Sequence, residues 1–281
     1  MRECLYCWLV EPIRPRFLDE SSAAPAVEIP IHTKKQIVRF AVFLDENGLP
    51  AYGRLRFTCG NADEIPNELM PLLQAVREHF LTLLRLDFSA NVNLFPRTIW
   101  WFIDYGADYS YGLDMRPLYS APVFDSSNFQ KLFTSGFDHR EELRLLLDGT
   151  DTRIPLQYRY LSLYRLLELV LRPDREWKKR DLCSELQPYS DRLKAAGFLR
   201  NPVNTLHELR DGCAHIANGQ EFGVTHLRFK QTKKVEKFLP ILLDVCLSLL
   251  NKKFGASLTV GRGPKPMAEP TSFALNEKVF Q

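Results

Sequence analysis

The spacing of hydrophobic positions changes character near residue 120 of this chain. Before that point, short apolar and alternating runs predict β-strands at residues 5–10, 27–31, 36–44 and 51–59. The sequence Asp45-Glu46-Asn47-Gly48 predicts a hairpin turn between the last two strands. We expect a helix at residues 66–86. The aromatic segment at residues 94–104 is either a strand or a short buried helix, and residues 106–120 are expected to form a loop.

After residue 120 the apolar pattern has the helical period almost throughout. Asp125 or Ser126 can cap a helix that runs to about residue 135, and Asp138 can cap a second that runs to residue 147. Residues 155–171 are apolar nearly all round, which is typical of the central helix of a bundle. Further helices are expected at residues 174–196, with a break near Pro188, from Pro202 until Gly219, and at residues 235–254.

These elements predict an α+β fold, with a small strand-containing N-terminal half followed by a helical bundle. We expect an N-terminal α/β domain with a β-hairpin and one long helix over residues 1–120, a bundle over residues 121–254 and a mobile tail over residues 255–281. The core of the bundle is expected to include Leu163, Leu166, Leu167, Leu206, Leu209, Cys213, Leu242 and Leu249.

The segment LHELRDGCAHI, at residues 206–216, combines ionisable side chains with a helical apolar pattern. At about 100° per residue, one side of this helix carries Leu206, Leu209, Cys213 and Ile216. The other side carries His207, Asp211 and His215, and Arg210 lies near the boundary. One interpretation is a solvated face on which Asp211 pairs with His207 or His215. The other interpretation is a functional site.

The spacing of Arg210, Asp211 and His215, R-D-x-x-x-H, resembles the signature of the HEPN superfamily of helical bundles. Many members of that superfamily are metal-independent ribonucleases that work as dimers, while others are inactive or bind nucleotides and partners. The resemblance implies that Arg210 stabilises a phosphate in the transition state and that His215 moves a proton, with Asp211 beside them as a third catalytic candidate. His207, on the same face, is the candidate for ligand binding. The resemblance also implies that the predicted bundle is HEPN-like.

A second resemblance covers more of the chain. The helical sequence EHFLTLLRLDF, a following Phe-Pro with an aromatic run, and then YLSLYRLLELVL and LRDGCAHI are similar to the methylamine utilization protein family MauJ. This resemblance implies an accessory role in methylamine utilization, beside a periplasmic amine dehydrogenase whose quinone cofactor is made from its own tryptophans. The resemblance assigns no catalytic role to any particular residue of this chain.

Composition narrows the classes of function. With 37 basic and 34 acidic residues, the formal charge of +3 is low for a protein that coats nucleic acid, although residues 172–180 and 229–237 are locally basic. Six cysteines without framework spacing favour a reduced, cytoplasmic protein, and the lone Cys4-x-x-Cys7 predicts neither a metal nor a redox site. Because no apolar stretch is long enough to span a bilayer, we expect no membrane partner.

Three classes of function remain open. The first is a non-enzymatic accessory or binding protein, with a protein partner or a second copy of the chain as its ligand and no cofactor or metal. The second is a metal-independent ribonuclease, which requires RNA as a partner and Arg210 and His215 exposed. The third is a nucleotide or small-ligand binder with a pocket that the 206–216 segment lines together with aromatic residues of the first half. We favour the first class.

Overall fold

The computed structural model describes residues 2–11, 24–44, 48–59, 69–88, 93–94, 99–102, 119–120, 124–172, 179–198, 201–214, 229–260 and 265–266. The chain divides into two compact units, Met1–Gln130 together with Gly261–Gln281, and Lys131–Val260. The composition change that we used to predict a boundary lies at residue 120, shortly before this division. A sheet followed by helices confirms the predicted α+β class.

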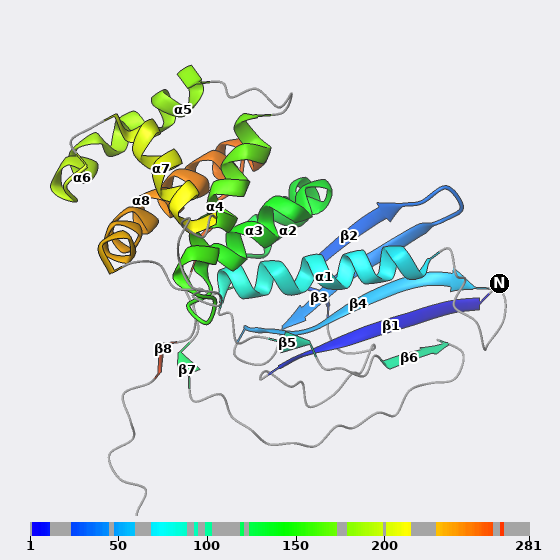
Figure 1. Ribbon diagram of the computed structural model, residues 1–281. Coiled ribbons are helices and arrows are strands. Elements are labelled where there is room, and N and C mark those ends of the chain that lie inside the picture. Colours follow the sequence, from blue (N-terminus) through cyan, green and yellow to red (C-terminus); the bar gives the residue numbers. More distant parts are fainter. Residues whose placement is uncertain are drawn as a thin grey trace, which may run out of the picture. The chain divides into compact units, whose positions relative to one another are not determined.

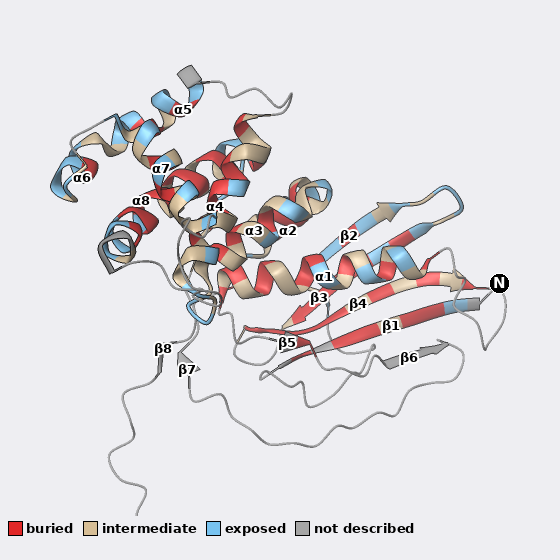
Figure 2. Ribbon diagram, in the orientation of Figure 1, coloured by how far each residue is buried: buried red, intermediate tan, exposed pale blue. Residues whose placement is uncertain are grey.

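Antiparallel strands build the first unit. They are β1 (Arg2–Glu11), β2 (Val27–His32), β3 (Ile37–Leu44), β4 (Pro50–Cys59), β5 (Asn93–Leu94) and β6 (Ile99–Phe102). Their order is β2-β3-β4-β1-β5, with β6 also paired to β1 (Figure 1). The middle strand of this order, β4, is buried or half-buried at every position (Figure 2).

The predicted hairpin joins β3 to β4, which pair in antiparallel register from Arg39 opposite Arg56 to Leu44 opposite Pro50. Gly48 has a φ of 75°, the left-handed conformation that a hairpin turn favours and that glycine adopts without a steric penalty. Residues 45–47 of the predicted turn lie outside the described residues. Residues 94–104, which the sequence predicts as either a strand or a short buried helix, contain the strand β6.

Helix α1 (Met70–Asp87) lies across one face of this sheet (Figure 1). Its buried positions follow the helical period that predicted it, and Phe80 is fully buried among them. The Phe80 ring packs edge-on against Phe40 of β3, with 5.3 Å between the ring centroids. A side chain at Gly53 of β4 would meet both rings, so glycine at this position permits the close packing of helix and sheet.

Residues Tyr119–Ser120, in the segment predicted as loop, form a short strand, β7, that pairs with β8 (Lys265–Pro266). At the start of the predicted mobile tail, Leu258 is buried and its backbone N–H donates to Oδ1 of Asn251 at 2.6 Å. Residues 261–264 and 267–281 of that tail lie outside the described residues.

The second unit is helical over the residues that the structure describes there. Its helices are α2 (Ser126–Gly136), which begins in the first unit, α3 (Arg140–Thr150), α4 (Leu156–Leu171), α5 (Lys179–Leu186), α6 (Ser190–Ala195), α7 (Pro202–Ala214) and α8 (Phe229–Phe254), with 3-10 turns η2 (Phe137–His139) and η3 (Gln187–Tyr189). As predicted for a central helix, α4 packs against α3, α7 and α8. Seven of the eight predicted core residues are buried, whereas Cys213 is only half-buried.

Local signals placed some helix ends correctly, although α8 begins at Phe229, six residues before the predicted start at residue 235. Oδ1 of Asp125 accepts the backbone N–H of Asn128 at 2.9 Å, as the predicted cap requires. Asp138 does not cap its helix, because it lies inside the 3-10 turn η2 and α3 begins at Arg140, after His139. Gly197, with a φ of 90°, follows the end of α6.

Helices α3 and α4 approach closely at Gly149, where a Cβ atom would lie 2.5 Å from Cγ of Leu163. Because Leu163 is fully buried and has little freedom to move, we expect Gly149→Ala to lower the free energy of unfolding by about 1–3 kcal/mol, despite the better helix propensity of alanine. Denaturant titration would measure this loss. In a Leu163→Ala background the same substitution should cost much less, and an equal cost in both backgrounds would contradict the proposed clash.

Candidate functional site

Helix α7 carries the 206–216 segment as far as Ala214. Oδ1 of Asn201 accepts the backbone N–H of Val203 at 2.9 Å and thereby satisfies a donor at the start of the helix. Leu206 and Leu209 are buried, which agrees with the predicted packing side. His215 and Ile216 lie outside the described residues, so the pairing of His215 with Arg210 stays a prediction.

Tyr160 anchors α7 to α4. Its side chain is fully buried, and its hydroxyl donates to the backbone carbonyl of Leu206 at 2.9 Å. Burial raises the pKa of Tyr160 well above its usual value, so the hydroxyl keeps its proton at neutral pH. This contact holds α7 in place at Leu206, the residue that precedes His207.

His207 forms a hydrogen bond with Tyr164, one turn further along α4. Nδ1 of His207 lies 2.7 Å from the Tyr164 hydroxyl, and the two rings pack edge-on with 5.8 Å between centroids. Burial, and then the negative charge of Glu168, raise the pKa of Tyr164 to about 12. The predicted ligand-binding histidine is therefore half-buried and held by a protonated tyrosine.

Arg210 and Asp211 lie at the surface of the unit as an ion pair, with 2.8 Å between Nη1 and Oδ1. The guanidinium also lies over the Tyr164 ring, with Cζ 5.6 Å from the centroid. The hydrogen bond to Asp211 raises the pKa of Arg210 and keeps it charged. Asp211 thus pairs with its neighbour Arg210, and His215, one of the two histidines predicted as its partner, lies outside the described residues.

Sequence reasoning missed the part of this site that α4 contributes. Glu168 accepts from Arg165 and from Arg172, each at 3.3 Å, and lies one turn beyond Tyr164. A signal was present, because Tyr164, Glu168 and Arg172 are spaced four apart; the first two are polar positions of a largely apolar helix, and Arg172 directly follows its last residue. The apolar pattern of residues 155–171 predicts only the central helix of a bundle.

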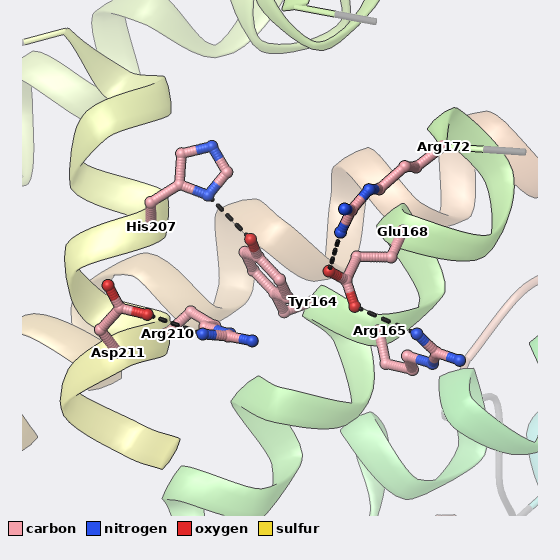
Figure 3. Close-up of polar contacts among 7 residues, drawn as sticks. All are labelled: Tyr164, Arg165, Glu168, Arg172, His207, Arg210 and Asp211. Carbon is pink, nitrogen blue, oxygen red and sulfur yellow. Dashed lines mark hydrogen bonds and ion pairs between the residues drawn. The ribbon is translucent and has the colours of Figure 1, made fainter. Parts of the chain in front are cut away.

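The two helices together form what we call the α4–α7 cluster, which consists of Tyr164, Arg165, Glu168, Arg172, His207, Arg210 and Asp211 (Figure 3). Three arginines face two carboxylates, so the cluster has a net positive charge with His207 neutral. The Arg210 and Arg172 side chains remain 37% and 36% exposed. An arranged set of guanidinium groups of this kind suits carboxylate or phosphate groups of a ligand.

Cys213, the nearest thiol on α7, is poorly suited to nucleophilic chemistry. Burial raises its pKa to about 12, so it is a thiol and not a thiolate at neutral pH. Over the described ranges no group of three or more His, Cys, Asp or Glu side chains could hold a metal ion. In that same part of the chain, no helix has both the length and the apolar character needed to cross a bilayer.

Comparison with protein-family models, with curated proteins and with solved structures found no match to this chain.

Proposed function

We propose that the protein is a non-enzymatic accessory or binding protein whose HEPN-like helical unit binds a partner through the α4–α7 cluster. One observation carries the proposal: Arg210, Asp211 and His207, the ionisable side chains predicted as the site on α7, each already have a partner within the α4–α7 cluster. Arg210 pairs with Asp211, and His207 bonds to Tyr164. The tyrosine that holds His207 keeps its own proton at neutral pH, and an exposed, oriented arginine such as Arg210 is a common recognition group.

The resemblance to the methylamine utilization family supplies the biological setting of the proposal. The protein would support amine catabolism from the cytoplasm, and its ligand would be another protein or a second copy of this chain. The positive cluster favours a partner surface that carries carboxylates, since these can replace Asp211 and Glu168 as acceptors for the arginines.

Growth of the source organism on methylamine tests this proposal. Deleting the gene should impair growth when methylamine is the nitrogen source and leave growth on ammonium unchanged. The wild-type gene should restore growth, whereas Arg210→Ala should restore it poorly. Arg192→Ala is a matched control, because Arg192 is also an exposed arginine that pairs with an aspartate, Asp244. Normal growth of the deletion strain on methylamine would refute the proposal.

A metal-independent ribonuclease is the second candidate. It is favoured by the orientation of Arg210, whose guanidinium is charged, exposed and held over Tyr164 on the helix that leads to His215. Attack by a 2′-hydroxyl needs a positioned base and a cationic clamp on the phosphate, and it needs no metal.

Incubation of purified protein with RNA in the presence of a chelator separates the two candidates. We expect no cleavage. Cleavage that is lost in His215→Ala and in Arg210→Ala, but kept in Arg192→Ala, would overturn the non-enzymatic proposal and establish the second candidate. Circular dichroism of each variant would show that the fold is intact.

A further inference from the structure

The sheet brings together two cysteines that are far apart in the sequence. Cys4 lies in β1 opposite Phe57, and Cys59 lies in β4 opposite Arg2, so the two cysteines are diagonal neighbours on adjacent antiparallel strands. Residues two apart on a strand share a face, which places both thiols on the same side of the sheet. Cys7, three positions after Cys4, points to the opposite face. The partner of Cys4 is therefore Cys59 and not the second cysteine of the C-x-x-C sequence.

The two sulfur atoms are in direct contact. The Sγ atoms of Cys4 and Cys59 are 2.6 Å apart, and both residues are buried. This separation is shorter than the distance at which non-bonded sulfur atoms rest, and a disulfide bond is about 2.0 Å long. Only a small movement is needed to close the bond, because the strand register already positions both side chains.

We propose that Cys4 and Cys59 are a redox-sensitive pair that forms a reversible disulfide between β1 and β4. A small-molecule disulfide is the oxidant. The thiolate of one cysteine attacks the oxidant and releases one small thiol, and the second cysteine then displaces the other small thiol. Two protein thiols and one small disulfide thus give one protein disulfide and two small thiols.

The position of the pair at strand ends provides a route for the oxidant. Cys59 is the last residue of β4, and Cys4 is near the start of β1. Ends of strands open locally at a lower free energy than the whole sheet. Burial, followed by the contact with Cys59, raises the pKa of Cys4 to about 12, so the closed pair reacts slowly. Exchange should therefore occur during folding or when this end of the ladder opens.

The bond would stabilise the N-terminal strand. It would link residues that are 55 positions apart and would thereby reduce the conformational freedom of the unfolded chain. We expect oxidation to raise the melting temperature of the protein by roughly 5–10 °C.

Peptide mapping of the wild-type protein tests the pairing directly. One sample is equilibrated in the native state with excess oxidised glutathione, and a second is refolded from urea in the same buffer. After the free thiols are alkylated, mass spectrometry should find a peptide that links Cys4 to Cys59 in the refolded sample and, more slowly formed, in the native one. Reduced dithiothreitol should remove the link and reverse the rise in melting temperature.

Two variants check the assignment. Cys59→Ser should lose both the linked peptide and the oxidation-dependent rise in melting temperature. Cys183→Ser removes an exposed cysteine of α5 and should keep both. The proposal is overturned if Cys4 and Cys59 remain fully alkylated in both wild-type samples, or if Cys4 links to Cys7 instead. The wild-type mapping decides the question even if Cys59→Ser fails to fold.

Discussion

Replacing Phe80 with alanine is expected to lower the free energy of unfolding of the first unit by about 3–5 kcal/mol. The ring is fully buried and packs edge-on against Phe40 and Phe129, with centroid distances of 5.3 and 6.1 Å. Its removal takes away the ring contact with Phe40 of the sheet and also leaves a cavity beside Gly53. Denaturant titration followed by a tertiary-structure probe would measure the loss.

Two substitutions serve as controls for Phe80. Glu78→Ala changes an exposed residue of the same helix and should alter the free energy of unfolding by no more than about 0.5 kcal/mol. Gly53→Ala should be destabilising in the wild-type protein, where the new Cβ would lie 2.8 Å from a carbon of Phe80, and should cost less in the Phe80→Ala background, where the contact with Phe40 at 3.1 Å remains. If Phe80→Ala cost no more than Glu78→Ala, the packing of α1 on the sheet would be misassigned.

The elements that sequence reasoning predicted well are those specified by local signals. Asp125 can cap α2 and Gly197 can end α6 because each acts within a few residues of its own position in the chain. Asp138 had the right chemistry for a cap, yet the chain forms a 3-10 turn there and starts α3 two residues later. A helix end marked by a local signal is therefore predictable to within about a turn, whereas α8 begins at Phe229, six residues before the predicted start at residue 235.

The contacts that define the site depend on long-range packing and could not be predicted in the same way. Tyr164 and His207 are 43 positions apart, and Cys4 and Cys59 are 55 apart. The sequence singled out Arg210, Asp211 and His207 on one helix, but it did not indicate that a tyrosine from α4 holds the histidine and lies under the arginine. Pairing of this kind follows from the register of strands and the packing of helices.

In α7, Leu209→Ala is expected to lower the free energy of unfolding by about 2–5 kcal/mol, and His207→Ala by only about 1 kcal/mol. Leu209 is buried, so its truncation leaves a cavity in the second unit. His207 is half-buried, and its loss removes mainly one hydrogen bond to the Tyr164 hydroxyl. A fully solvated face, which is one of the two interpretations of the sequence, predicts a smaller loss for His207→Ala.

A double-mutant cycle separates the hydrogen bond of His207 from its packing. Tyr164→Phe removes the same bond from the other side while it keeps the aromatic ring under Arg210. If the bond is the main contribution of His207, the double variant should be little less stable than either single variant, because the interaction can be lost only once. Strictly additive losses in denaturant titrations would show that the two side chains are not coupled. Equal losses for Leu209→Ala and His207→Ala would mean that the buried and exposed sides of α7 are misassigned.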